Sequence, residues 1–252
     1  MALIRLEDVS RKYGNRVALT DVTLSFDPGE WVFVLGPSGA GKSTLLRILA
    51  LAERPSSGRI EVDPEALAHR RDGHGTPAEA AAPETETDET PRKRPKRVPV
   101  RRVRRLVGVL GQEFRLLPDR NVYENIAIAC QITGVWDRAR IRERVTPLLD
   151  DMGIRGKELL YPNDLSAGEK QRVALARAMA RFPKILIADE PTGNLDPAAA
   201  SQIFALLRDI CQHGTLVAVA THAEDWLRRY PGRAIRLERG FVRSDQLEGA
   251  EA

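Results

Sequence analysis

Short apolar runs alternate with longer segments of helical periodicity along most of this 252-residue chain. The apolar runs have the length and composition of strands buried on both faces, and they are residues 31–35, 106–110, 185–189 and 216–221. The segments with apolar positions at helical spacing are residues 122–132, 137–152, 170–179 and 197–212. Because buried strands that alternate with helices favour a parallel sheet, the pattern predicts an α/β fold with a mainly parallel core sheet.

The two ends of the chain carry further strand signals. Residues 3–9, 17–25 and 59–62 are predicted strands near the start, and residues 233–237 and 241–243 form a final pair. Residues 113–168 are predominantly helical in pattern, so we expect a helical subdomain there. With 42% hydrophobic residues the chain can bury a full core, and residues 1–252 are predicted to form a single domain.

The segment that follows the first buried run has the pattern G-x-x-x-x-G-K-[ST] of a phosphate loop. The preceding strand and the following helical residues 45–49 are the context that such a loop needs, which weighs against a glycine-rich turn that binds nothing. Backbone N–H groups would surround the phosphates, Lys42 would reach the β- and γ-phosphates, and Ser43 would ligate Mg²⁺. The predicted nucleotide-binding residues are Gly36, Pro37, Ser38, Gly39, Ala40, Gly41, Lys42, Ser43 and Thr44.

The buried run 185–189 ends in two carboxylates, Asp189 and Glu190. Alone, such a pair is more often a solvated strand end. Downstream of a phosphate loop, however, it lies where a parallel strand opens onto the ligand crevice. We therefore predict Asp189 as a Mg²⁺ ligand, directly or through water, and Glu190 as the catalytic residue that orients or deprotonates the attacking water.

Residues 165–169 open the helical segment that runs to residue 179. Ser166, followed three residues later by Glu169, forms a capping box, which by itself explains these residue types. The capping box does not explain their position, about twenty residues before the strand that ends in Asp-Glu, and this position favours a functional role.

Together these segments resemble, in their order, the ATP-binding cassette (ABC) ATPase family of P-loop NTPases. The match includes the family's signature sequence at residues 165–169, except that Ala167 replaces the usual glycine. The resemblance implies an antiparallel β part beside the core sheet, and an ATPase that uses ATP and Mg²⁺. It also implies that Gln112 contacts Mg²⁺ and the attacking water, that His222 contacts the γ-phosphate, that Tyr13 stacks on adenine, and that Asp196 belongs to the nucleotide site.

In this family two cassettes bind head to tail, so the resemblance implies that the chain needs a second copy of itself or a related cassette. We expect a homodimer in the ATP state. Ser166 and Gly168 of one copy would then complete the nucleotide site of the other. Because the capping box places Ala167 in the first helical turn, we expect helical backbone angles at that residue.

Residues 112–125 most resemble the family's cell-division ATPases, which act with an FtsX-like integral membrane protein in the activation of peptidoglycan hydrolases. This implies a peripheral protein on the cytoplasmic side of the membrane at the division site. Neither an apolar run long enough to span a bilayer nor a secretory signal is apparent. One alternative is the ATPase of a lipoprotein-release or macrolide-export transporter. An alternative of another class is a nucleotide-gated binding module that uses a basic insert.

That insert, residues 63–105, is rich in Pro, Ala, Glu and Thr and then in Arg, and it is predicted to be partly disordered. Residues 92–105 contain nine Arg and Lys residues, without which the net charge of +4 would become −5. From Arg92 to Arg105 the favoured interpretation is a solvated loop whose charges pair with the acidic half of the insert. Contact with an anionic membrane surface is the next alternative, ahead of nucleic acid. Cys130 and Cys211 have no metal or redox spacing and are predicted to be buried free thiols.

Overall fold

The structure is a computed structural model and describes residues 2–63 and 103–248. Its strands are β1 (Ile4–Tyr13), β2 (Arg16–Phe26), β3 (Trp31–Leu35), β4 (Ser57–Val62), β5 (Val107–Leu110), β6 (Ile185–Asp189), β7 (Leu216–Ala220), β8 (Gly232–Glu238) and β9 (Phe241–Glu248). Its helices are α1 (Lys42–Leu49), α4 (Val122–Ile132), α5 (Arg138–Asp151), the 3-10 turn η1 (Pro162–Asp164), α6 (Ala167–Met179), α7 (Pro197–Gln212) and α8 (Asp225–Arg229).

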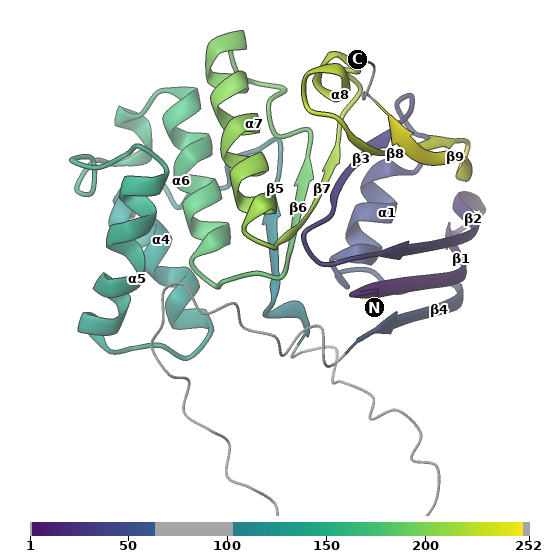
Figure 1. Cartoon of the computed structure of the whole chain (residues 1–252). Coiled ribbons are helices and arrows are strands. Elements are labelled where there is room, and N and C mark those ends of the chain that lie inside the picture. Colours follow the sequence, from purple (N-terminus) through teal and green to yellow (C-terminus); the bar gives the residue numbers. More distant parts are fainter. Residues whose placement is uncertain (1, 64–102, 249–252) are drawn as a thin grey trace, which may run out of the picture.

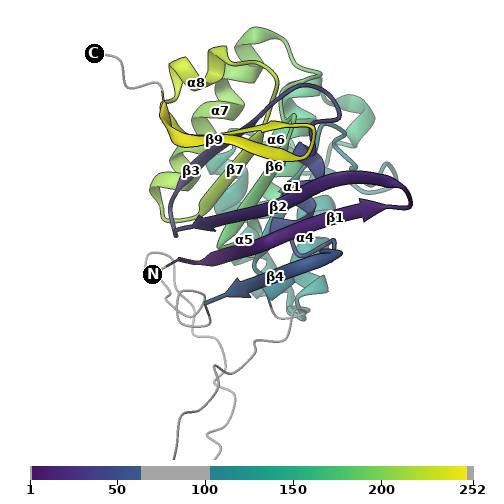
Figure 2. The same cartoon turned by 90° about the vertical axis from the view of Figure 1, so that its right-hand side faces the viewer.

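A six-stranded sheet in the order β5-β6-β7-β3-β8-β9 crosses the middle of the molecule (Figure 1). Its strands pair in parallel except for β9, which runs antiparallel to β8. The predicted mainly parallel sheet is therefore confirmed. A separate antiparallel sheet of order β2-β1-β4 lies beside it, as Figure 2 shows, and is the antiparallel part that the family resemblance implies.

Each face of the six-stranded sheet is covered by its own hydrophobic core. Along β3, Val32 and Val34 contribute to a core with α1 and the antiparallel sheet, whereas Phe33 and Leu35 contribute to a core with α4, α5, α6 and α7. Strands β6 and β7 alternate between the two cores in the same way. This is why these strands are apolar without interruption: both faces of each strand are buried.

The helical part lies at one side of the sheet and comprises α4, α5 and α6 (Figure 1). Polar side chains begin these helices: Asn121 and Ser166 form capping boxes, and the side chain of Asp137 accepts a bond from the Arg140 N–H. The buried amide of Asn125 bonds to Leu117 and to two further carbonyls, which shapes the loop that leads into α4. Within the described residues, no helix is long and apolar enough to cross a membrane.

Only the ends of the predicted insert, residues 63 and 103–105, lie within the described residues. Residues 64–102, including most of the basic segment, lie outside the described residues. Val103 is buried in the core beside α1, and Arg104 donates a 2.6 Å bond to the carbonyl of Leu51. Arg104, although exposed, is thus hydrogen-bonded to the described fold. Cys130 and Cys211 are buried free thiols, as predicted.

Candidate nucleotide-binding and hydrolysis site

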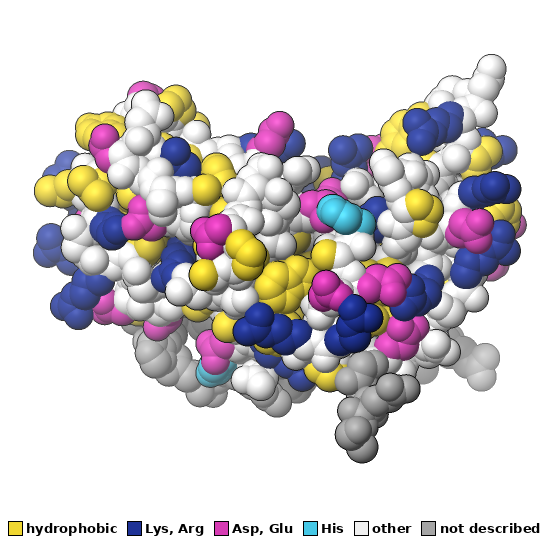
Figure 3. All heavy atoms as spheres, turned by 90° about the horizontal axis from the view of Figure 1, so that it is seen from above, with side chains coloured by type: hydrophobic (Ala, Val, Ile, Leu, Met, Phe, Trp, Pro, Cys, Tyr) yellow, Lys and Arg dark blue, Asp and Glu magenta, His cyan; other side chains and the backbone are white. Residues whose placement is uncertain are grey.

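The predicted site residues meet at the carboxyl edge of the six-stranded sheet. The phosphate loop follows β3, His222 follows β7, Asp189 ends β6, and Gln112 follows β5. Because β3, β7, β6 and β5 are consecutive neighbours in the sheet, these four segments lie side by side at the same edge. Figure 3 looks onto the molecule from this side and shows histidine, acidic and basic side chains together near its middle.

The phosphate loop depends on glycines at two close backbone approaches. Gly36 has φ 144°, and a Cβ there would lie 2.2 Å from the carbonyl oxygen of Leu237. Gly41 has φ 110°, and its Cβ would lie 2.5 Å from the carbonyl oxygen of Ala18. Any larger residue would push the loop away from β8 and β2, so the motif glycines are required by this backbone as well as by phosphate.

Lys42 lies over its own loop at the start of α1. Its Nζ donates to the carbonyl oxygens of Gly36 at 2.8 Å and Pro37 at 3.2 Å. The ammonium group is therefore held at the mouth of the loop, at the N-terminus of α1, where backbone N–H groups and the helix dipole favour an anion.

The catalytic candidates Glu190 and His222 contact each other. His222 Nδ1 lies 2.9 Å from Glu190 Oε1. Glu190 has φ 48°, an uncommon value for this residue type, and its N–H donates a 2.9 Å bond to the carbonyl of Ala220 at the end of β7. The backbone at the end of β6 is thereby turned toward β7, and this turn directs the Glu190 side chain to His222.

Gln112 belongs to the same edge. Its backbone carbonyl accepts a 3.2 Å bond from Asn194 Nδ2, and its side-chain Nε2 lies 3.2 Å from where a Cβ on Gly193 would be. The segment after β5 thus lies against the turn that follows Glu190.

These segments line one cleft of about 920 Å³. The predicted residues that line it are Tyr13, Ser38, Gly39, Gly41, Lys42, Ser43, Thr44, Gln112, Asp189, Glu190 and His222. Tyr13, 38% exposed, is stacked on one face by the guanidinium of Arg11 at 4.5 Å and donates its hydroxyl to Glu53. Gly36, Pro37 and Ala40 belong to the loop but do not line the cleft.

Sequence reasoning missed two cations in the cleft, Arg16 at the start of β2 and Arg47 on α1. The Arg16 guanidinium lies 3.3 Å from where a Cβ on Gly39 would be, so it approaches the phosphate loop directly. Arg16 follows Tyr13 by three residues across the β1–β2 turn. This closeness to the predicted adenine contact is the feature of the sequence that could have indicated Arg16 as a site residue.

Three further predicted residues, all outside the phosphate loop, do not line the cleft of their own chain: Ser166, Gly168 and Asp196. Ser166 caps α6, and its capping box with Glu169 is present in both directions. Asp196 caps α7 by accepting bonds from the Ala198 and Ala199 N–H groups, both at 2.9 Å. Ala167 is the first residue of α6 and has no positive φ, so its predicted helical conformation is confirmed.

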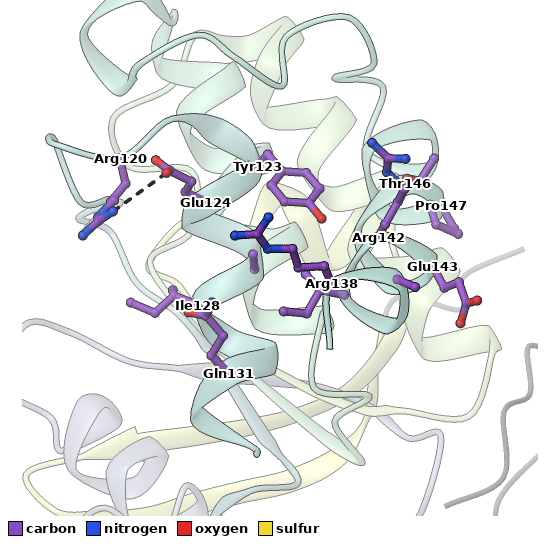
Figure 4. A pocket seen from close by; sticks show the side chains of 13 residues that line it. Arg120, Tyr123, Glu124, Ile128, Gln131, Arg138, Arg142, Glu143, Thr146 and Pro147 are labelled. Atoms are coloured by element: carbon purple, nitrogen blue, oxygen red, sulfur yellow. Dashed lines mark ion pairs between the residues drawn. The ribbon is translucent and has the colours of Figure 1, made fainter. Parts of the chain in front are cut away.

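A second and larger cavity, about 1220 Å³, lies in the helical part between α4 and α5 (Figure 4). We call it the α4–α5 groove. Tyr123 and Arg138 extend into the space between the two helices. Ala127, Ile128 and Ile141 supply apolar lining, while Arg120 is paired with Glu124 at 3.8 Å.

The fold and this site define an ATP-binding cassette. Residues 19–193 match the ABC transporter family, and the chain belongs to that family. A dimeric post-hydrolysis structure of the ATP-binding cassette MJ0796 bound to ADP and Pi has a similar fold, with a TM-score of 0.74 and 29% identity over 97% of this chain and 98% of that one. The predicted P-loop fold and ABC resemblance are confirmed.

Within the family, the chain is similar to proteins named cell division ATP-binding protein FtsE. The relative from Streptococcus pneumoniae is 39% identical over 99% of this chain and 97% of its own length. The relative from Escherichia coli is 39% identical over 95% of this chain and 97% of its own length, and that from Mycobacterium tuberculosis is 37% identical over 98% and 97%.

Proposed function

We propose that this chain is the ATP-hydrolysing subunit of a membrane complex that acts in cell division. The observation that carries the proposal is the grouping of the phosphate loop, Gln112, Asp189, Glu190 and His222 around one cleft at the carboxyl edge of the parallel sheet. Family membership supports the ATPase activity, and the names of the relatives support the role in division.

In this proposal the chain's residues divide the work of phosphoryl transfer. Lys42 exchanges its carbonyl contacts for the β- and γ-phosphates of ATP, and the loop N–H groups hold the same oxygens. Glu190 orients the attacking water, while His222, which contacts Glu190, lies beside the γ-phosphate. Tyr13 stacks on the adenine ring.

The cleft also suits Mg²⁺. Ser43, Gln112 and Asp189 line it with hydroxyl, amide and carboxylate oxygens, the ligand types that Mg²⁺ takes together with phosphate oxygens and water. When bound, the ion would neutralise charge on the phosphates. No group of three or more His, Cys, Asp or Glu side chains suited to a metal occurs among the described residues, so nucleotide oxygens would complete this set.

A second copy of the chain would complete each site. Ser166 is exposed at the start of α6, with Gly168 in the same first turn, away from the cleft of the same chain. We infer that two copies bind head to tail around ATP, with Ser166, Gly168 and Asp196 at the shared interface. The dimeric cassette MJ0796 supports this arrangement.

The membrane partner would dock at the α4–α5 groove and the preceding loop, residues 113–121. Tyr123 and the apolar lining of the groove suit a short partner helix, and Arg138 and Arg142 would pair with acidic residues on it. We propose an FtsX-like integral membrane protein as this partner, which places the chain peripherally on the cytoplasmic side of the membrane at the division site.

The test is an affinity pull-down of the tagged chain from detergent-solubilised membranes in ATP, with mass spectrometry of the recovered proteins. We expect an FtsX-like protein with the wild type and more of it with Glu190→Gln, in which turnover is blocked. Arg142→Glu should reduce recovery, whereas Arg5→Glu, at an exposed position of β1, should not. Recovery of a lipoprotein-release or exporter permease would overturn the division role, and recovery of nucleic acid instead would favour the binding-module alternative.

A further inference from the structure

Gln171 on α6 is fully buried and connects three parts of the site. Its Nε2 donates to the carbonyl oxygen of Pro191 at 2.5 Å and to that of Gly111 at 3.3 Å. Its Oε1 is buried and has no hydrogen-bond partner within the part of the chain that the structure describes. The buried amide therefore stabilises the structure through the two bonds that its NH₂ group donates, because its oxygen accepts none.

The two carbonyls adjoin catalytic candidates. Gly111 immediately precedes Gln112, and Pro191 immediately follows Glu190. One side-chain NH₂ group thus ties the segment after β5 and the segment after β6 to α6, five residues beyond the Ser166 cap. A second tie lies further along α6, where Arg177 donates to the carbonyls of Phe114 and Arg115 at 2.9 and 2.7 Å.

An apolar side chain of similar length would fill the same volume without an orphan oxygen, but it would leave both carbonyls without this donor. An enclosed carbonyl without a hydrogen-bond donor is unfavourable, so we expect the two segments to shift until water or another N–H donates to it. Such a shift would move Gln112 and Glu190 relative to the phosphate loop, because the hydrogen bonds of Gln171 go to the Gly111 and Pro191 carbonyls. Small displacements of positioning groups reduce turnover strongly while binding contacts persist.

We propose that Gln171 is a positioning residue that holds Gln112 and Glu190 in the hydrolysis-competent arrangement and links that arrangement to α6. Ser166 caps the start of the same helix, so Gln171 ties the two catalytic segments to the helix that carries the proposed surface for a second copy. This inference rests on the proposed ATPase function and adds a residue to it.

The first test compares steady-state ATP hydrolysis and nucleotide binding of Gln171→Met with the wild-type full-length chain. We expect kcat to fall about tenfold, equivalent to about 1.4 kcal/mol, with KM and nucleotide affinity within about twofold. Gln212→Met makes the same chemical change at an exposed position at the end of α7 and should leave both constants unchanged.

The second test uses Gln171→Glu, which keeps the shape but can donate only when its carboxyl is protonated. Burial between two carbonyls raises the pKa of that new carboxyl, so protonation should restore one donated bond as the pH falls. We expect the ratio of variant to wild-type kcat to rise several-fold from pH 8.5 to pH 6. Asp189, Glu190 and His222 are present in both proteins, so the wild type measured at the same pH values is the control for them.

A flat ratio across this range, or a kcat of Gln171→Met equal to wild type, would overturn the proposal. A rise in KM as large as the fall in kcat, together with a lowered melting temperature, would also overturn it, because these changes indicate general damage to the fold. If Gln171→Met does not fold, the pH dependence of the kcat ratio of Gln171→Glu to wild type tests the proposal alone. Absence of hydrolysis in the wild type itself would instead contradict the proposed ATPase function, so the two failures are distinct.

Discussion

Glu190 and His222 form a direct contact, 2.9 Å between Oε1 and Nδ1, although 32 residues separate them in the chain. Strands β6 and β7 are neighbours, and the residues that follow them are brought together at one edge of the sheet. The Glu190 side chain is 20% exposed and that of His222 is 73% exposed. The carboxylate is thus partly enclosed and oriented, while the exposed imidazole lines the cleft, where we propose that it contacts the γ-phosphate.

Glu190→Gln should retain ATP and lose turnover. The amide has the shape of the carboxylate but cannot take a proton from water, and a positioned acid–base group contributes about 10²- to 10⁴-fold to rate. We expect kcat to fall at least about 100-fold, with nucleotide affinity unchanged, as measured by single-turnover hydrolysis and equilibrium binding. Normal turnover in this variant would remove Glu190 from the mechanism.

His222→Ala should also lower kcat, and the double variant should lose less than the two single losses combined, because the residues in contact act together. His213→Ala is the matched control: this histidine is exposed at the end of α7, outside the cleft, and its replacement should leave kcat unchanged. Additive losses at positions 190 and 222 would indicate independent roles.

Arg16→Ala should weaken ATP binding through the loss of a cation beside the phosphate loop. An exposed charge contact of about 1 kcal/mol corresponds to about a fivefold rise in Kd, and the difference should shrink at high salt because ions screen it. Arg5→Ala, at an exposed position on β1, provides the control. Unchanged affinity at low salt would show that Arg16 does not contact the nucleotide.

The buried parts of the fold could be predicted from the sequence because buried strands and helices have apolar residues at characteristic spacings. β3 and β6 match their predicted bounds, and so do α4 and α7, since apolar runs and helical spacing mark them. β9 was predicted as residues 241–243 but extends to Glu248. The sequence did not indicate its full length, because an exposed edge strand has polar residues and no apolar pattern. α8 and η1 were not predicted because each is shorter than two helical turns.

The site was predictable where a local motif encodes it and not where tertiary structure creates it. The phosphate loop is local, because glycines and Lys42 must stand at fixed spacing around one turn. Arg16 enters the cleft only through the position of the β1–β2 turn, and the bonds of Gln171 join segments 60 and 20 residues away. No pattern of residue types in α6 distinguishes such an amide from an ordinary helix glutamine.

Gly41→Ala should abolish the phosphate-loop geometry. The new Cβ would lie 2.5 Å from the carbonyl oxygen of Ala18 and 2.9 Å from Leu19 Cδ2, and φ is 110°. Backbone strain of about 1–3 kcal/mol together with this clash should raise the Kd for ATP about tenfold or more. Gly14→Ala separates the two effects: φ there is 57°, but nothing lies within 4 Å, so it should lower stability only slightly and keep ATP affinity. Equal affinities of the two variants would contradict the clash argument.

Lys157 and Glu169 form an ion pair that anchors the first turn of α6 to the loop before it. The bond from Lys157, followed by the backbone N–H of Ser166, lowers the pKa of Glu169 to about 2. A carboxyl whose pKa is lower in the folded than in the unfolded chain stabilises the fold above its unfolded pKa of about 4.5, and this stabilisation is lost as the pH falls toward 2.

Glu169→Gln should therefore cost stability at neutral pH and little in acid. The amide can still reach back to the Ser166 N–H, so the change isolates the charge. Both partners are partly exposed, so we expect about 0.5–1 kcal/mol, or a fall in melting temperature of about 1–4 °C at pH 7. Between pH 4.5 and pH 3 the gap to wild type should narrow, because the wild-type carboxylate begins to protonate in the unfolded chain first. Glu143→Gln on the exposed face of α5 should show no comparable gap at either pH, and a Glu169→Gln gap that stays constant or widens in acid would contradict the lowered pKa.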